Sequence, residues 1–467
     1  MVRKYIGDKA FYRRALALAL PIMVQNGITN FVSMLDNVMV GQVGTVQMTG
    51  VAVANQLIFV FNLCIFGAVS GAGIFGAQYS GCGDHEGVRH TFRFKLIVCV
   101  VLTLLCGTIF VLWCDPLVNA YLKGEGSAAD AAASLGFARD YLRVMLVGLI
   151  PYAIVQCYSS TLRESGETVL PMVAGLAAVG INLCFNYILI FGKLGAPKLG
   201  VVGAAIATVI SRFAELVIVA IWTRTHADRN LFIVGAFRSL YVPRRLIKQI
   251  SLKGLPLMLN ETFWAAGMAM LTQCYSVRGL DVVAANNISS TFFNVFSVAF
   301  QAIGVAIGII LGQQLGAGQT EEARDSSRKL IAFSVFVSVL VAIVYAVAAE
   351  FIPHIYNTEP SIRLTATRLM QISALVFPLD AFANASYFTL RSGGKTLVTI
   401  LFDSCFVWAV QVPVALALSR WTMLPILPLF AVCQLLCFIK CIFGYWLVKK
   451  GVWIRNIVAD TQPVAAE

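Results

Sequence analysis

Long apolar stretches follow one another along the whole chain, and several exceed the roughly 20 residues with which a helix spans a bilayer. Of the 467 residues, 59% are hydrophobic and 12% are charged, and the mean hydropathy is +0.81. An ordinary soluble domain has about 25% charged residues, so a water-soluble fold of this size would lack the polar residues that its surface needs. The sequence therefore predicts an all-α polytopic membrane protein.

Apolar runs, and the polar residues that separate them, predict twelve transmembrane helices. The expected segments are 15–40, 48–80, 94–115, 137–161, 170–192, 200–222, 250–275, 285–315, 330–352, 369–388, 396–419 and 425–448. Several of these segments are longer than the bilayer is thick, so we expect tilted helices whose ends reach into water.

Lys and Arg are distributed unevenly among the connections between these segments. Of the 35 basic residues, 23 lie in or at the edges of the alternate connections that include both tails, and 7 lie in the intervening connections. The positive-inside rule then places both termini in the cytoplasm, with the chain in an inner or plasma membrane. The same rule accounts for most of the net charge of +12, so no nucleic-acid partner is predicted.

Three short motifs occur twice and in the same order. They are Leu-Pro-x-Met at 20–23 and 255–258, Gly-x-x-Glu-x-x-Arg at 83–89 and 318–324, and Leu-Arg-x-x-Gly-x-Thr at 162–168 and 390–396. A duplication of this kind predicts two parallel-repeat bundles of six helices, related by an axis along the membrane normal. We expect an N-terminal six-helix lobe at 1–222, a passive cytoplasmic linker at 223–249, a C-terminal lobe at 250–450 and a cytoplasmic tail at 451–467.

Carboxylates inside the predicted segments are few. A charged carboxylate there costs roughly 2.5–3.5 kcal/mol on insertion scales, so each one needs a partner or a cavity. Glu215 lies three residues after Arg212, which predicts an ion pair on one helix face. Asp403 lies near the cytoplasmic end of its segment and can either reach a basic neighbour or take part in function. Three others have no Lys or Arg within a helical turn: Asp36, Glu261 and Asp380.

Polar side chains accompany these three acids in the same segments. Gln25 and Asn26 precede Asp36, Asn260 adjoins Glu261, and Asn182 and Asn186 share one face of the fifth segment. Thr208 of the sixth segment is the remaining supporting polar residue. Amides in hydrocarbon either bind neighbouring helices together or line a shared polar pocket, and both interpretations stay open. A carboxyl group taken out of water can exchange a proton near neutrality, whereas a cluster of oxygens can hold Na⁺.

Two stripes of small residues recur at helical spacing, and we assign both to helix packing. The glycines repeat every four residues near the end of the eighth segment, and the cysteines do so in the twelfth: Gly304, Gly308, Gly312 and Gly316, and Cys433, Cys437 and Cys441. The cysteines have no His nearby at metal-ligand spacing, so no catalytic metal site is predicted.

The residues themselves resemble a known family. Residues 20–44, LPIMVQNGITNFVSMLDNVMVGQVG, resemble the opening helix of the multidrug and toxin extrusion (MATE) transporters. The two Leu-Arg-x-x-Gly-x-Thr motifs and the stretch from Gly200 to Thr208 are similar to the same family. The resemblance covers about residues 10–450.

This resemblance implies twelve helices in two lobes around a V-shaped cavity, and export of organic cations and amphipathic drugs in exchange for H⁺ or Na⁺. Asp36 matches the acidic residue of the family's first helix, which takes part in cation coupling and drug release. Glu261 and Asp380 match the acids of the seventh and tenth helices, which resemble a cation site that can hold Na⁺. Asn182 and Asn186 match polar positions of the fifth helix, and some relatives carry Asp at the second.

We therefore expect a secondary-active multidrug antiporter that works by alternating access. The alternative is a lipid-linked saccharide flippase of the same superfamily, but a pyrophosphate would require a cationic cleft, and the unpaired charges here are mainly acidic. An enzyme is disfavoured because H-E-x-x-H and G-x-S-x-G are absent, and without a nucleotide-binding P-loop no cofactor is expected beyond the coupling ion. The expected partners are small cationic or amphipathic substrates and membrane lipids, and the expected state is a monomer.

Overall fold

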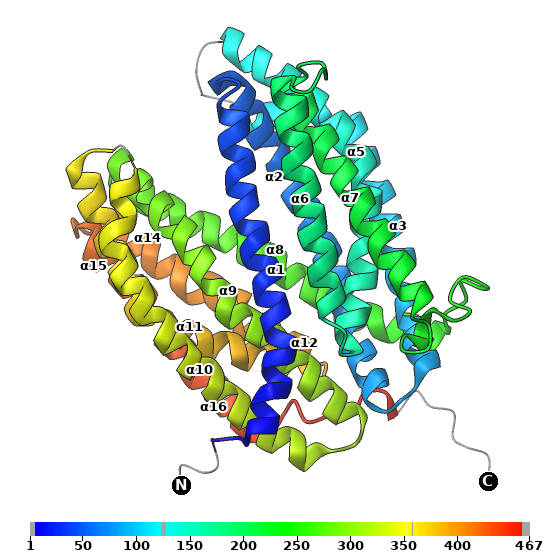
Figure 1. Cartoon of the computed structure of the whole chain (residues 1–467). Helices are drawn as coiled ribbons and strands as arrows, with labels where there is room; N and C mark the ends of the chain where they lie inside the picture. The colour runs from blue at the N-terminus through cyan, green and yellow to red at the C-terminus, as the bar shows by residue number, and fades with distance from the viewer. Residues whose placement is uncertain (1–4, 123–127, 357, 460–467) are drawn as a thin grey trace, which may run out of the picture. The chain divides into compact units, whose positions relative to one another are not determined.

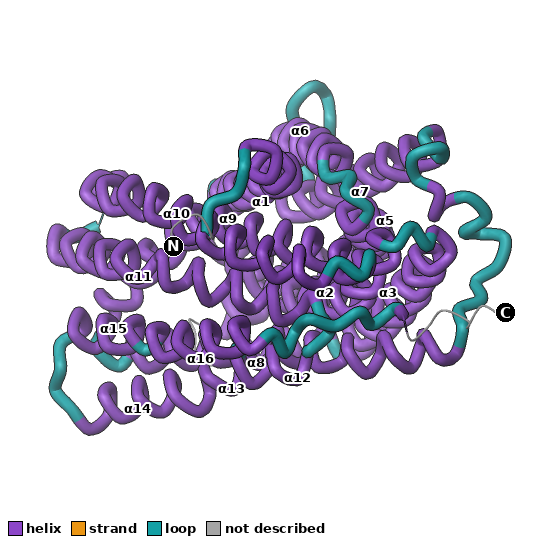
Figure 2. Tube along the Cα trace, turned by 90° about the horizontal axis from the view of Figure 1, so that it is seen from below, coloured by secondary structure: helices purple, strands orange, loops and turns teal. Residues whose placement is uncertain are grey.

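The computed structural model describes residues 5–122, 128–356 and 358–459 (Figure 1). Within these ranges all regular secondary structure is helical, as predicted, and loops join the helices (Figure 2). The first half holds α1 (Lys9–Gly41), α2 (Thr45–Gly81), α3 (His85–Leu112), the short α4 (Cys114–Leu122), α5 (Ala128–Glu164), α6 (Val169–Phe191) and α7 (Gly200–Thr225). Short 3-10 turns, η2 (Leu231–Ile233) and η3 (Ile352–Ile355), lie in the connections.

The second half repeats this series of long helices. It holds α8 (Arg244–Ser276), α9 (Leu280–Gly316), α10 (Thr320–Phe351), α11 (Pro360–Ser392), a segment made of α12 (Thr396–Phe402), α13 (Ser404–Phe406), the π-helical turn η4 (Val407–Gln411) and α14 (Val412–Trp421), and a last segment made of α15 (Ile426–Leu435) and α16 (Cys437–Lys450). The predicted twelve-helix, six-plus-six architecture is therefore confirmed.

Two of the twelve segments are less apolar than the rest. Ten helices of the described chain are long and apolar enough to cross a membrane by length and composition alone. The two others are α8 and α11, which carry Glu261 and Asp380. These helices therefore combine the length of a membrane span with a polar surface, which is expected where a helix lines a site inside the membrane.

Pro and Gly at equivalent places shape both halves. The first and fourth long helices of each half contain an internal proline: Pro21 in α1, Pro151 in α5, Pro256 in α8 and Pro378 in α11. Proline has no N–H for the helical ladder and so loosens the backbone of these four helices. The repeated motifs end helices with glycines of positive φ, at +73° and +76° for Gly83 and Gly318 and at +95° and +69° for Gly166 and Gly394. Only glycine adopts this conformation readily, which explains why the motifs recur.

Contacts between residues divide the chain into two compact units. Unit 1 comprises residues 1–23, 77–83 and 249–467, and unit 2 comprises residues 24–76 and 84–248. In unit 2 the connection after α7 is bound to α3, because the Arg93 guanidinium donates to the carbonyl oxygens of Gly235 at 2.8 Å and Ala236 at 2.9 Å. Phe232 of this connection is 2% exposed and lies against Phe92 of α3. This stretch is therefore anchored, which its composition did not predict.

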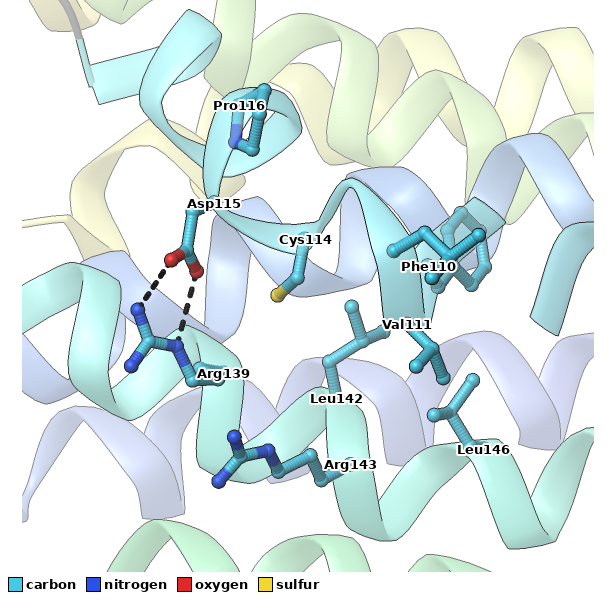
Figure 3. Close-up of a pocket in the computed structure, with 10 residues that line it drawn as sticks. Phe110, Val111, Cys114, Asp115, Pro116, Arg139, Leu142, Arg143 and Leu146 are labelled. Carbon is cyan, nitrogen blue, oxygen red and sulfur yellow. Dashed lines mark hydrogen bonds and ion pairs between the residues drawn. The ribbon is translucent and has the colours of Figure 1, made fainter. Parts of the chain in front are cut away.

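A hollow of about 360 Å³ lies in unit 2 where α3, α4 and α5 meet (Figure 3). Apolar side chains of α3 and α5 line it together with residues of α4 and the charged side chains Asp115, Arg139 and Arg143. Arg139 donates two hydrogen bonds to Asp115, at 2.7 and 3.0 Å. None of the acids predicted for the functional site lines this hollow. The hollow is therefore separate from the functional site that the sequence predicts.

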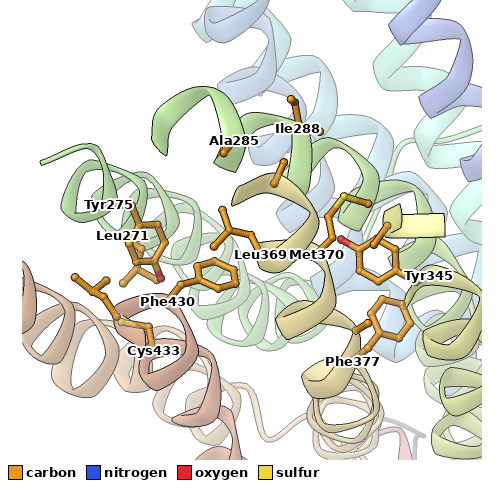
Figure 4. Close-up of a cluster of buried hydrophobic side chains, with 14 of the residues drawn as sticks. Leu271, Tyr275, Ala285, Ile288, Tyr345, Leu369, Met370, Phe377, Phe430 and Cys433 are labelled. Carbon is orange, nitrogen blue, oxygen red and sulfur yellow. The ribbon is translucent and has the colours of Figure 1, made fainter. Parts of the chain in front are cut away.

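The core of unit 1 is a cluster of buried aromatic and aliphatic side chains. Four of its side chains are fully buried and pack together with residues of α8, α9 and α15: Tyr345, Leu369, Met370 and Phe377 (Figure 4). A second buried cluster joins α9, α10, α11 and α16 to Ala15, Leu18 and Ala19 of α1. The core thus fixes α8, α11 and α16 relative to one another; α8 and α11 carry Glu261 and Asp380, and α16 carries Lys440.

The glycine stripe of α9 makes close contacts, as expected of a packing surface. A Cβ on Gly316 would lie 1.9 Å from the carbonyl oxygen of Gln78, and a Cβ on Gly81 would lie 1.9 Å from that of Gln313. Gln78 and Gln313, like Gly81 and Gly316, are 235 residues apart. The end of α2 and the end of α9 therefore cross through equivalent residues, at a distance that only glycine permits.

Candidate functional site

Asp36, in unit 2, lies among amide side chains. It is half-buried on α1, and Asn186 of α6 donates its Nδ2 to Asp36 Oδ1 at 2.7 Å. Asn182, one turn earlier on α6, accepts from Asn186 Nδ2 at 3.0 Å. Both asparagines are buried, at 6% and 1% exposure. The predicted i, i+4 pair of the fifth segment is thus found beside the predicted acid of the first.

The amide of Asn182 is compatible with two orientations that differ by a 180° turn. In one, its Nδ2 donates to Thr208 Oγ1 of α7 at 3.2 Å and its Oδ1 faces Asp36. In the other, its Nδ2 lies 3.1 and 3.2 Å from the two carboxyl oxygens of Asp36, and its Oδ1 accepts from Thr208. The first orientation suits a protonated Asp36, which has an O–H to donate, and the second suits an ionised one, which can only accept.

Gln25 and Asn26, the other two polar residues predicted on α1, do not contact Asp36. Gln25 accepts from the Arg163 guanidinium at 2.6 Å, and this arginine belongs to the first Leu-Arg-x-x-Gly-x-Thr motif. Asn26 is half-buried, and in the described ranges it forms no hydrogen bond with Asp36. The structure therefore brings Asn182, Asn186 and Thr208 to Asp36 and leaves Gln25 and Asn26 outside its first contacts.

Glu261, in unit 1, lies beside a tyrosine that the sequence did not single out. The Tyr387 hydroxyl of α11 donates to Glu261 Oε1 at 3.1 Å. Asn260 Nδ2 lies 3.5 Å from the same hydroxyl. Asn260 and Tyr387 are buried, at 0% and 8% exposure, whereas Glu261 is half-buried. One oxygen of the Glu261 carboxylate thus accepts a hydrogen bond, while the side chain remains partly exposed.

Asp380 lies two residues after the proline of α11 and faces α16. Cys437 Sγ lies 3.3 Å from Asp380 Oδ1, and Cys441 Sγ lies 3.3 Å from the carbonyl oxygen of Leu379. A thiol is a weak donor, so this contact satisfies the carboxyl group only in part. Two members of the cysteine stripe that was assigned to packing are therefore also neighbours of a candidate site residue.

Asp403 forms an ion pair with a lysine from the last helix. Lys440 Nζ of α16 lies 2.5 Å from Asp403 Oδ1, and Asn260 Nδ2 donates to Asp403 Oδ2 at 3.1 Å. The other side of the Asn260 amide accepts from the Ser404 hydroxyl at 2.7 Å. Of the two interpretations that the sequence left open for Asp403, the structure thus shows the basic neighbour.

The three remaining acids have no such cation. Within the described part of the chain, neither Asp36 nor Glu261 nor Asp380 forms an ion pair with a Lys or Arg side chain. By contrast, Arg212 and Glu215 form the predicted pair on α7, at 3.1 Å. A partly exposed carboxyl group with neutral hydrogen-bond partners can take up and release a proton or a small cation, which a paired one cannot do without first losing its partner.

Lys440, Tyr387 and Cys437 are the contacts that sequence reasoning missed. A signal was present for one of them, since Lys440 is a basic residue within a predicted span and about as costly there as an acid. Tyr387 and Cys437 gave no signal, because aromatic and small apolar residues are common in every span. Their roles depend on which helix faces which, and a single sequence does not specify that.

A polytopic protein made of two related six-helix halves, with unpaired carboxylates inside its helices, has the construction of a secondary transporter. The family model MatE matches residues 21–188 and 256–416, one match in each half of the duplication. The chain belongs to the MatE family.

Individual relatives agree with this assignment over most of their length. "Probable multidrug resistance protein NorM" of Thermotoga maritima is 27% identical over 423 residues, covering 89% of this chain and 87% of the relative. The multidrug resistance protein MdtK of Yersinia enterocolitica is 25% identical over 415 residues, covering 88% of each.

Solved structures show the same fold. An outward-facing multidrug resistance MATE family transporter of the MOP superfamily matches with a TM-score of 0.84 at 18% identity, covering 96% of this chain and 98% of the other. A variant of the Vibrio cholerae MATE transporter VcmN matches with a TM-score of 0.85 and the same identity and coverage.

Proposed function

We propose that the protein is a secondary-active multidrug exporter that exchanges organic cations and other amphipathic drugs for H⁺ or Na⁺ by alternating access. The observation that carries this proposal is the set of three half-buried carboxyl groups with neutral partners, Asp36 in unit 2 and Glu261 and Asp380 in unit 1. The relatives that are named multidrug resistance proteins support the drug substrate.

The shell of Asp36 supports coupling to protons. Asn182 can present either an acceptor or a donor to the carboxyl group, so the shell satisfies both the protonated and the ionised form. The Thr208 hydroxyl is a partner for the Asn182 amide in both orientations, whereas Asn186 Nδ2 donates to Asn182 Oδ1 in the first one only. Proton binding would then turn one buried amide and leave the packing of α1, α6 and α7 unchanged.

Glu261 and Asp380 form the second coupling site in this proposal, and their oxygens suit Na⁺ as well as H⁺. Asn260 and Tyr387 position Glu261, and Cys437 contacts Asp380. One charge that moves inward across 100 mV releases about 2.3 kcal/mol. At about 1.4 kcal/mol per decade, this energy sustains a drug gradient of about fiftyfold for each net charge that enters. A monovalent cationic drug that leaves in exchange for one H⁺ or Na⁺ moves no net charge, so the ion gradient alone drives that exchange.

The proposed organisation follows from the duplication. Two six-helix lobes at 1–222 and 250–450, a cytoplasmic linker at 223–249 and a cytoplasmic tail at 451–467 lie in the inner or plasma membrane with both termini in the cytoplasm. The protein works as a monomer without a cofactor, catalyses no chemical reaction, and contacts only lipids and small cationic or amphipathic substrates.

The test is efflux of a planar organic cation such as ethidium from proteoliposomes, with a pH gradient and a Na⁺ gradient imposed separately. The proposal predicts that at least one gradient drives efflux in the wild type. The triple variant Asp36→Asn, Glu261→Gln and Asp380→Asn should fail to respond to either gradient. A matched variant, Asp325→Asn, removes an exposed carboxylate at the start of α10 and should behave as the wild type.

Two results would overturn the proposal. If neither gradient moved the dye in the wild type, the saccharide flippase would become the better function, and transfer of a fluorescent pyrophosphate-linked lipid would be measured next. If the triple variant kept gradient-driven efflux, the protein would be an exporter whose coupling groups lie elsewhere.

A further inference from the structure

The C-terminal unit holds a positive charge within its acid network. Lys440 lies in the first turn of α16, near the middle of the last segment formed by α15 and α16, and its side chain is 15% exposed. It pairs with Asp403, whose side chain is 16% exposed. The long lysine side chain thus ends inside the helix bundle and not at the membrane surface, where a lysine near a helix end would place its charge.

A continuous series of contacts joins this pair to Glu261. Asp403 Oδ2 accepts from Asn260 Nδ2 at 3.1 Å, Asn260 Nδ2 lies 3.5 Å from the Tyr387 hydroxyl, and that hydroxyl donates to Glu261 at 3.1 Å. A second route follows α16 itself. Cys437, one turn before Lys440, contacts Asp380 at 3.3 Å. The pair therefore adjoins both acids of the proposed coupling site.

Equivalent residues of the N-terminal half do not have this carboxylate. Asn260 corresponds to Gln25 at the 235-residue offset, and Asp403 corresponds to Gly175 at the 228-residue offset. The two equivalent positions are neighbours in unit 2 as well, because a Cβ on Gly175 would lie 2.8 Å from Gln25 Nε2. The position of Asp403 thus carries glycine in the other half, whereas the position of Lys440 carries a second cation, Arg212, which pairs with Glu215 of its own helix.

We propose that Lys440 is a tethered cation that occupies Asp403 permanently, so that the C-terminal site presents two exchangeable negative charges and not three. This inference rests on the proposed function, because it takes Glu261 and Asp380 as the groups that exchange the coupling ion. The charged and titratable side chains that act on Lys440 are Asp403, Asp380 of α11, and Cys437 and Cys441 of α16 itself. Those that face Glu261 of α8 are Asp403 and, on α11, Tyr387 and Arg391.

The proposal predicts opposite effects for the two single substitutions. Lys440→Met removes the tethered cation and leaves Asp403 as a third negative charge, so the site should bind a mobile cation more tightly, by about tenfold or more. Asp403→Asn leaves the ammonium without its partner beside the two remaining acids, so cation binding should weaken by a similar factor. The double variant restores the charge balance and should bind within about threefold of the wild type.

The experiment measures ²²Na⁺ binding to purified protein in detergent and, for proton coupling, the external pH that gives half-maximal efflux of ethidium from proteoliposomes. The variants are Lys440→Met, Asp403→Asn, the double variant, and Lys440→Arg, which keeps the charge. Glu261→Gln reports whether the measured ion binds at the proposed site. Thermal unfolding in the same detergent shows which variants are folded, and the double variant keeps the comparison available if one single variant is not.

Opposite changes in cation affinity for Lys440→Met and Asp403→Asn would support the tethered cation. A purely structural ion pair would instead weaken binding in both single variants, in parallel with lower thermal stability, and this result would overturn the inference while leaving the proposed function intact. If Glu261→Gln changed neither Na⁺ binding nor the pH dependence, the coupling site itself would be wrong, and the inference would be overturned with it.

Discussion

The acids of the two units lie in different surroundings. In unit 2, Asp36 is hydrogen-bonded by the Asn186 amide, and Arg212 is near enough to act on its charge. Unit 1 has two acids with neutral hydrogen-bond partners and a third, Asp403, that forms an ion pair with Lys440. The helices that carry them nevertheless share prolines and turn glycines at equivalent places. The two halves therefore share these backbone features, whereas the polar side chains around their acids differ.

The largest expected effect concerns a buried ion pair that only one half has. Lys95 of α3, whose side chain is 0% exposed, lies 2.6 and 2.8 Å from the carboxyl oxygens of Glu164. The equivalent residues of the other half are Leu330 and Ser392. Lys95→Met should lower the free energy of unfolding by about 3–5 kcal/mol, because it removes the ammonium group that neutralises a buried carboxylate.

Equilibrium unfolding of the detergent-solubilised protein at increasing denaturant concentration measures this change in free energy. The double variant Lys95→Met and Glu164→Gln should recover most of the loss, and Leu330→Met at the equivalent site should cost less than about 1.5 kcal/mol. Equal losses in Lys95→Met and Leu330→Met would show that the two halves do not differ in this respect.

Next in size is the effect of Asp36→Asn on transport. The asparagine keeps the shape of the side chain and cannot exchange a proton, so gradient-driven efflux should fall about a hundredfold, as for the loss of an essential intramembrane acid. Efflux rates from proteoliposomes measure this loss. Asp115→Asn removes a carboxylate of the same unit outside the site and is the matched control. Efflux that stays within a factor of two of the wild type would remove Asp36 from the mechanism.

The glycine crossing of α2 and α9 tests whether the halves are still equivalent in packing. Gly81→Ala and Gly316→Ala each place a methyl group 1.9 Å from a carbonyl oxygen, so each should cost about 1–3 kcal/mol of stability. Gly107→Ala, which has open space around its Cβ position, should cost nothing and is the control. A large effect at one of the two crossing glycines alone would contradict the equivalence, and melting temperatures in detergent give the comparison.

A smaller effect is expected from Tyr387→Phe. This substitution removes the hydroxyl that donates to Glu261 at 3.1 Å and leaves the ring in place. A hydrogen bond to a charged group contributes about 1.5–3 kcal/mol, so the affinity of the C-terminal site for Na⁺ should fall about tenfold if Glu261 binds it as a carboxylate. Binding of ²²Na⁺ measures the change. Tyr445→Phe, at an exposed tyrosine of α16, should bind as the wild type.

The sequence sufficed to predict the fold and the candidate acids, but it did not predict how these residues meet. Charges in apolar segments are so costly that Asp36, Glu261 and Asp380 stood out without any neighbour being known. The repeated motifs contain the four glycines that end helices with positive φ, but their repetition alone predicted only the duplication. The contacts of these acids could not be predicted in the same way. Lys440 and Asp403, for example, are 37 residues apart and meet only because α16 packs beside α12. The contact between the linker and α3 was not predicted, because Arg93 binds backbone carbonyl oxygens there. Every residue has a carbonyl oxygen, so the sequence gives no signal for such a contact.

The central claim is that unpaired carboxyl groups in both halves carry the ion that drives export. The most direct measurement is ion movement driven by the drug itself: an ethidium gradient is imposed across proteoliposomes, and proton and Na⁺ fluxes are recorded. The account predicts that the wild type moves one of these ions against the dye, and that Asp36→Asn and the pair Glu261→Gln and Asp380→Asn each abolish this flux. Undiminished ion flux in both variants would contradict it.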